Sequence, residues 1–275
     1  MTTDSSPHSE ASVFWRQDGD IAIVTLNRPQ ALNSLDPAMH QDLREALDAI
    51  EAAPEIRAMV LTGAGRGFCA GADLSSFDFT PGDDMVARAD PGPVIDKLFN
   101  PTTRRLMALR MPTICAVNGV AAGAGASLVM ACDIALATPK ASFIQAFSKI
   151  GLIPDAGSSW LLPHRVGLQR ALALAITGDK LSAVDAKAYG MIWDVIDGEA
   201  EDCLRAAQAM AHRLAVMPTA ALVATRQLMR DAAHRDLDTQ LDAERDMQSA
   251  LGKTHDYFEG VKAFLDKRPA NFKGN

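Results

Sequence analysis

The chain has 275 residues, with 27 Lys and Arg against 34 Asp and Glu, so its formal net charge at pH 7 is −7. Hydrophobic residues make up 48% and charged residues 22%, which excludes a disordered chain, a fibrous repeat and a disulfide scaffold. The acidic balance argues against nucleic acid as a partner. Only 5% of the residues are aromatic, whereas Ala and Gly are abundant, and small residues let backbones approach each other closely.

Cysteine spacing and the N-terminus indicate the compartment. No two cysteines have a CxxC spacing, which favours reduced thiols in a cytoplasmic protein over disulfides or a zinc site. The N-terminal MTTDSSPHSEAS is polar and lacks the apolar segment of a signal peptide, so we expect residues 1–11 to form a flexible tail. The most apolar stretch, 119–132, is too short to span a bilayer, and no membrane association is expected.

Strand and helix patterns alternate over the first two thirds of the chain. Short apolar runs predict strands at 13–16, 21–26, 57–62, 113–117 and 133–137. Apolar residues at a spacing of 3.6 predict helices at 37–53, 94–109 and 125–132. The segment 78–93 is rich in Pro, Gly and Asp and predicts a loop. Strands that alternate with helices indicate an α/β core, which we place at residues 12–198.

The pattern changes after residue 198, where strand signals stop. Four amphipathic stretches predict helices at 199–216, 219–233, 238–251 and 254–267. Residues 199–275 are therefore predicted to form a helical region that covers the core or a neighbouring subunit.

Two glycine-rich turns each follow a predicted strand. The first is GAGRGFCAGAD at 63–73 and the second is NGVAAGAG at 118–125. Free backbone N–H groups at such turns can bind an anion or a developing oxyanion. Neither turn fits the GxGxxG or GxxxxGK[ST] pattern, so dinucleotide and P-loop sites are excluded on their own spacing. The alternative is a pair of tight turns packed in a core.

Three ordered segments together resemble the crotonase family, the enoyl-CoA hydratases and isomerases. They are TGAGRGFCAGADL, AVNGVAAGAGASLVMACDIALA and IGLIPDAGSSWLLP, and the resemblance extends from about residue 12 to the C-terminus. It implies a spiral of ββα repeats with a C-terminal helical region that builds trimers, often paired into hexamers. It also implies an acyl-CoA thioester as substrate and no cofactor. The sequence has no HExxH motif or His/Cys cluster that would suggest a metal site.

In that family two backbone N–H groups bind the thioester oxygen. The motifs assign them to Ala72 and Ala124. Removing a proton beside a thioester places negative charge on its oxygen, and losing one preorganised donor to such a charge typically costs ~3 kcal/mol. Backbone donors require small neighbouring residues, which the two turns supply.

The acid/base residue decides which reaction runs. Family hydratases use two glutamates at positions that here hold Ser127 and Phe147, and neither side chain can replace a glutamate in proton transfer. Asp155 stands where hydratases commonly carry glycine and several isomerases carry aspartate. One carboxylate suffices for a proton shift between the α- and γ-carbons, and apolar neighbours would raise its pKa. Alternatively, Asp155 caps the helix that begins near Gly157.

The resemblance also implies a set of substrate-binding residues. Besides Asp155, Ala72 and Ala124, the predicted site contains Arg28, Ala70, Gly71, Asp73, Leu74, Gly123, Phe147 and Lys273. Arg28 and the basic C-terminus could meet the CoA phosphates, although a solvated basic C-terminus is an equal alternative. Asp73 could instead fix its loop, and Phe147 and Phe79 could be core residues or line an acyl pocket.

Further segments resemble the isomerases of this family that act on ring-1,2-epoxyphenylacetyl-CoA, in particular FNPTTRRLMALRMPTICAVNGVAAGAGASL and YGMIWDVID. The leading hypothesis is therefore an acyl-CoA isomerase of phenylacetate or fatty-acid degradation. It would convert the ring epoxide or shift a 3-enoyl to a 2-enoyl double bond. The alternatives are an enoyl-CoA hydratase that positions water with another group, and a non-catalytic acyl-CoA-binding protein.

Overall fold

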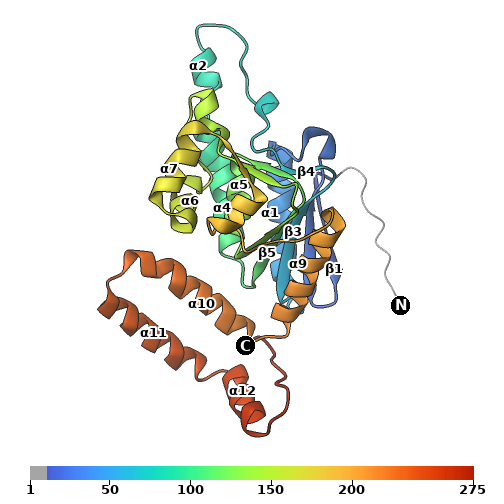
Figure 1. Ribbon diagram of the computed structural model, residues 1–275, viewed down its shortest axis with the longest axis vertical. Coiled ribbons are helices and arrows are strands. Elements are labelled where there is room, and N and C mark those ends of the chain that lie inside the picture. Colours follow the sequence, from blue (N-terminus) through green and yellow to red (C-terminus); the bar gives the residue numbers. More distant parts are fainter. Residues whose placement is uncertain (1–10) are drawn as a thin grey trace.

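The computed structural model describes residues 11–275, and all but the last residue of the predicted N-terminal tail lies outside this range (Figure 1). The strands are β1 (Val13–Asp18), β2 (Ile21–Leu26), β3 (Ala58–Gly63), β4 (Gly67–Cys69), β5 (Thr113–Val117), β6 (Val120–Ala122), β7 (Ile134–Ala137), β8 (Ser142–Ile144), β9 (Lys180–Ser182) and β10 (Asp194–Val195). The α-helices are α1 (Pro37–Ala52), α2 (Met85–Arg88), α3 (Gly92–Val94), α4 (Asn100–Met107), α5 (Ala124–Ala131), α6 (Ser158–Val166), α7 (Leu168–Thr177), α8 (Ala183–Ala188), α9 (Ala200–Ala215), α10 (Thr219–Asp231), α11 (Leu237–Leu251) and α12 (His255–Leu265).

The strands form two sheets. The larger has the order β1-β2-β3-β5-β7-β10 and is parallel except for the β1–β2 hairpin. The smaller has the order β4-β6-β8-β9, with β9 antiparallel. Parallel strands require crossover connections, which the helices supply.

The chain alternates between the two sheets in a regular way. In β3–β4, β5–β6 and β7–β8 the first strand joins the larger sheet and the second joins the smaller, and helical segments follow. This arrangement confirms the predicted spiral of ββα repeats. The strands of the smaller sheet were not predicted, because each has only three residues.

Helices cover both faces of the larger sheet. On one face α1, α4 and α5 contribute to the main buried cluster. On the other, α9 buries Cys203, Ala207, Ala211 and Ala215, a four-residue spacing of small side chains that lets the helix lie close to β2, β3 and β5. The layer that covers the larger sheet therefore includes α9, which lies beyond residue 198, the predicted end of the core. Helices α10–α12 extend away from this body as a helical arm (Figure 1).

The predicted helix at 94–109 is present but irregular. It starts as α3, continues as a π-helical turn at Ile95–Phe99 and ends as α4. Pro101 is the cause, because proline has no N–H to donate to the preceding turn. The π-turn places Phe99 among the buried residues.

Two further findings bear on the compartment. All four cysteines are buried free thiols. Within residues 11–275 no helix is both long and apolar enough to cross a membrane.

Candidate active site

The two glycine-rich turns touch each other. Gly71 has a φ of +93°, and a Cβ there would lie 2.7 Å from the carbonyl oxygen of Ala122. Gly125 lies in the first turn of α5, and a Cβ there would lie 2.2 Å from the carbonyl oxygen of Cys69. Only glycine permits these approaches, which bring the N-terminus of α5 against strand β4, which lies within the first turn.

This contact exposes two backbone donors to the same space. An isolated parallel bridge pairs Ala72 with Leu35, but it uses the C=O of Gly71 and the N–H of Asp73, so the Ala72 N–H takes no part in it. Ala124 is the first residue of α5, where the N–H has no acceptor within the helix. The N–H groups of Ala72 and Ala124 are therefore available to a bound group.

Both turns line one cavity of about 510 Å³. Eight of the eleven predicted site residues lie in its wall: Ala70, Gly71, Ala72, Leu74, Gly123, Ala124, Phe147 and Asp155. The remaining wall is apolar and comes from the 74–95 segment, the π-turn and the segment before Asp155: Phe77, Phe79, Ala89, Pro91, Ile95, Phe99, Ala146, Ile150 and Leu152.

The side chain of Asp155 is half-buried in this wall, and its Oδ1 atom is buried without a hydrogen bond from any residue of 11–275. The helix-capping alternative is wrong, because Gly157 is the N-cap of α6 and it is the backbone carbonyl of Asp155 that accepts from Ser158 N–H. Burial raises the pKa of the Asp155 carboxyl to about 6, offset in part by its own backbone N–H.

The two positions that hold glutamate in hydratases are occupied by groups that cannot transfer a proton. The Ser127 hydroxyl is fully buried and lies 2.8 Å from the Ser158 hydroxyl. The ring of Phe147 forms part of the cavity wall. Asp155 is thus the one carboxylate in this wall.

Three predicted binding residues do not line the cavity. The Arg28 guanidinium donates to the Ser34 carbonyl at 2.6 Å and to Asp73 Oδ2 at 2.8 Å, and it also pairs with Asp36. Lys273 lies in a separate groove near Arg57.

Asp73 has the loop-fixing role that was considered as an alternative. It caps the short helix Leu74–Ser76 by accepting from the Ser75 N–H. The hydrogen bond from the Ser75 hydroxyl, reinforced by Arg28, lowers the pKa of the Asp73 carboxyl to about 2. Arg28 and Asp73 together connect the first glycine-rich turn to the segment after β2.

Several residues of the wall could not be predicted from the sequence. Phe77, Phe99 and Ile95 line the cavity but have no local motif that marks them. The predicted loop at 78–93 indicated part of the wall, because a loop that follows the first glycine-rich turn in the chain can cover the cavity beside that turn. Phe79, considered earlier for an acyl pocket, does line the cavity.

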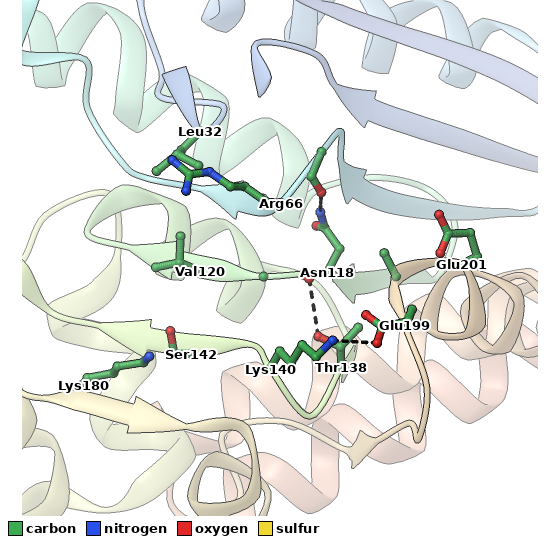
Figure 2. Close-up of a pocket in the computed structure, with 13 residues that line it drawn as sticks. Leu32, Arg66, Asn118, Val120, Thr138, Lys140, Ser142, Lys180, Glu199 and Glu201 are labelled. Atoms are coloured by element: carbon green, nitrogen blue, oxygen red, sulfur yellow. Dashed lines mark hydrogen bonds and ion pairs between the residues drawn. The ribbon is translucent and has the colours of Figure 1, made fainter. Parts of the chain in front are cut away.

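A second cleft of about 600 Å³ lies at the bend between the two sheets (Figure 2). Its walls carry charges of both signs, and Lys140 pairs with Glu199 at 2.6 Å across it. Asn118 is held by the carbonyl oxygen of Gly65 at 2.8 Å. None of the predicted site residues lines this cleft, so the chemistry is assigned to the apolar cavity.

Metal ligands are not grouped in the part of the chain that the structure describes, since no set of three or more His, Cys, Asp or Glu side chains is arranged to hold an ion. The cavity instead combines two backbone donors, one carboxylate and apolar walls. This arrangement can stabilise negative charge on a carbonyl oxygen and move a proton beside it.

The raised pKa of Asp155 predicts a pH dependence of stability. Between its ordinary value of 3.8 and about 6, the folded protein retains a proton that the unfolded chain has released. The free energy of unfolding therefore decreases as the pH rises through this range. We expect Asp155→Asn to remove this slope and to be more stable than the wild type at pH 8, measured by urea unfolding. The exposed Asp238→Asn is the control, and an unchanged slope in Asp155→Asn would contradict the burial of the carboxyl.

Comparison with known proteins identifies the family to which the chain belongs. The profile of the family "Enoyl-CoA hydratase/isomerase" matches residues 16–275. The 1,2-epoxyphenylacetyl-CoA isomerase of Escherichia coli K12 is 48% identical over 254 residues, which cover 92% of this chain and 95% of that protein. The probable enoyl-CoA hydratase of Rhodobacter capsulatus is 40% identical over 255 residues, covering 92% and 95%. The crystal structure of an enoyl-CoA hydratase from Bacillus anthracis superposes with a TM-score of 0.86 at 30% identity, covering 96% of this chain and all of that one. The chain belongs to the enoyl-CoA hydratase/isomerase family and has the crotonase fold.

Proposed function

We propose that the protein is an acyl-CoA isomerase in which Asp155 moves a proton beside a thioester held by the N–H groups of Ala72 and Ala124. One observation carries the proposal. The Asp155 carboxylate has a buried oxygen without a partner, and it lies in the wall of the cavity that both glycine-rich turns also line. The reaction needs no cofactor beyond the CoA ester, because a proton shift changes no oxidation state.

The steps follow from this arrangement. The thioester oxygen accepts hydrogen bonds from Ala72 and Ala124, which makes the α-protons more acidic. Asp155 takes the α-proton of a 3-enoyl-CoA, and the C–H electron pair delocalises into a dienolate whose charge rests on the thioester oxygen. The protonated Asp155 returns the proton at the γ-carbon, which leaves the double bond between the α- and β-carbons. A pKa of about 6 suits both transfers near neutral pH.

The aromatic wall supports a ring-bearing acyl group. Four of the ten phenylalanines in the chain line this one cavity: Phe77, Phe79, Phe99 and Phe147. Aromatic walls stack favourably on a flat ring. We propose ring-1,2-epoxyphenylacetyl-CoA as a substrate, in agreement with the name of the Escherichia coli relative. In its conversion to the oxepin, the C–C bond that the epoxide shares with the six-membered ring opens to give the seven-membered ring, both C–O bonds are kept, and one proton moves from the α-carbon to a ring carbon.

Hydration is the second candidate, because the Rhodobacter capsulatus relative is named as a hydratase. A hydratase must position water and protonate the α-carbon. The hydroxyl of Ser127 and the ring of Phe147 cannot do this, which favours isomerisation. Robust hydration of crotonyl-CoA would support this second candidate.

Removing the carboxylate tests the proposal. We expect Asp155→Asn to lower kcat for 3-hexenoyl-CoA and for epoxyphenylacetyl-CoA by about 10²–10⁴-fold, since general acid–base groups typically contribute that much. The affinity for the thioester should persist, because the two N–H donors and the apolar wall are unchanged. Stopped-flow kinetics and calorimetric binding of a saturated acyl-CoA measure both quantities. Wild-type turnover in Asp155→Asn would contradict the assignment.

Arg28 has two competing roles that kinetics can separate. The ion pairs to Asp73 and Asp36 predict that it holds the first glycine-rich turn, whereas the sequence predicts contact with the CoA phosphates. If Arg28 holds the turn, Arg28→Gln lowers kcat about tenfold with KM within about twofold, because a displaced oxyanion donor affects the transition state. The exposed Arg213→Gln is the matched control. A raised KM with unchanged kcat would instead indicate phosphate binding.

We also propose that the chain assembles into a trimer or a hexamer through its C-terminal helices. The family resemblance supports this, as does the apolar surface of α12, where Phe264 is 83% and Leu265 71% exposed. Lys273 and the last basic residues would then reach the CoA of a neighbouring subunit. The predicted cytoplasmic location stays a prediction.

Sedimentation velocity tests this assembly. The expected mass is about three or six times the 29.3 kDa of one chain. Phe264→Glu should shift the distribution toward the monomer, because it places a charge in an apolar contact. A wild-type species of 29.3 kDa at micromolar concentration would contradict the proposal.

A further inference from the structure

Two buried serines lie next to the proposed proton carrier. Ser127 is in α5, one turn after the predicted oxyanion donor Ala124, and Ser158 is the first residue of α6, after the loop that carries Asp155. Both are fully buried, and their hydroxyl oxygens are 2.8 Å apart. This pair therefore bridges the two elements that present the donor and the carboxylate.

The hydrogen bonds of the pair converge on the backbone of Asp155. The Ser127 hydroxyl lies 3.3 Å from the Asp155 carbonyl oxygen, and the Ser158 N–H donates to the same oxygen at 2.8 Å. The Ser158 O–H can donate to Ser127, and the single proton of the Ser127 hydroxyl is then shared between the Asp155 carbonyl and the Gly123 carbonyl, which lies 3.4 Å away. The pair thus fixes the main chain at the point where the carboxylate branches off.

The loop after Asp155 needs such support. Ala156 has a φ of +48°, an unfavourable conformation for a residue with a Cβ, and it is followed by Gly157 at +88°. Backbone of this kind persists only where its surroundings hold it. On the far side, the Thr103 hydroxyl donates to the Ala156 carbonyl at 3.2 Å. Hydroxyl groups from α4 and α5 therefore hold the successive carbonyl groups of Ala156 and Asp155, and α6 adds the Ser158 N–H.

We propose that Ser127 and Ser158 are positioning residues that couple the oxyanion helix to the Asp155 loop and set the carboxylate at its working distance from the bound thioester. The inference rests on the proposed isomerase function. It follows from the absence of a hydrogen bond to Asp155 Oδ1 within residues 11–275, since the position of the carboxylate must then come from its backbone. The serine at the hydratase glutamate position thus has a role of its own.

The test uses Ser127→Ala, Ser158→Ala and the double variant, assayed with 3-hexenoyl-CoA. Each single variant should lower kcat about tenfold, because small displacements of a reacting group are costly, while KM stays within about twofold. The double variant should lose no more than the single variants, since each removes the same bridge. The apparent pKa on the acid limb of the pH profile of kcat should also shift, because a loosened loop admits water to the Asp155 carboxyl. A residue with only a structural role would lower the folded fraction and leave these quantities unchanged.

Two controls make the outcome decisive. Ser142→Ala, a buried serine of β8 away from the cavity, should keep the wild-type kcat. If Ser127→Ala does not fold, the kcat of Ser158→Ala alone tests the inference, because alanine is favourable in the first turn of a helix.

Two results would overturn the inference. One is a kcat within twofold of the wild type in the folded variants, and the other is a loss of kcat in the double variant equal to the product of the two single losses. If Asp155→Asn is inactive while the serine variants have the wild-type kcat, the positioning role of the serine pair is overturned and the proposed isomerase function stands. If Asp155→Asn is active, the proposed isomerase function is overturned.

Discussion

A carboxyl group buried without a hydrogen-bond partner for one of its oxygens imposes the main constraint on this molecule. Burying such a group is unfavourable for its ionised form, and burial raises the pKa of Asp155 to about 6. The group is nevertheless held in a defined place by a loop with positive φ angles at two successive residues. Elsewhere in the fold, several more exposed carboxylates are paired with arginine or lysine, as Asp194 is with Lys187. Here the fold holds a carboxyl group whose ionised form is destabilised by burial. A raised pKa of this kind is the property that a proton carrier beside an apolar substrate requires.

The rest of the site depends on how closely the backbone can pack. The first turn contains β4 and the second contains β6, and those strands are neighbours in the smaller sheet. Glycine at 71 and 125 allows the two turns to touch, so that the N–H groups of Ala72 and Ala124 reach one space. The abundance of small residues therefore has a specific use at these turns, and a second one in α9, where alanines let the helix lie on the sheet. Backbone dipoles, which do not depend on the acidic net charge of the chain, face the negative charge that would develop on the thioester oxygen.

Much of the fold could be predicted from the sequence, for reasons that differ between elements. Helices α1, α9 and α10 have long amphipathic patterns, and the start of α1 is marked by Asp36 and Pro37, with Asp36 accepting from the Met39 N–H as a cap. The strands of the smaller sheet could not be predicted, since three residues are too few for periodicity to show. Asp155 could be selected because it departs from a family motif. The pairing of Arg28 with Asp73, 45 residues away in the chain, and the aromatic wall that includes Phe77 and Phe99 depend on tertiary contacts that leave no local pattern.

Partial burial desolvates the carboxyl of Asp155 and raises its pKa to about 6. Infrared difference spectroscopy measures this directly, by recording the carboxyl band across a pH titration of the wild type and subtracting that of Asp155→Asn. The structure predicts a band attributable to Asp155 with a midpoint at about pH 6. A midpoint at the ordinary value of 3.8 would show that the carboxyl is solvated or paired, and would contradict its role as a proton carrier in an apolar cavity.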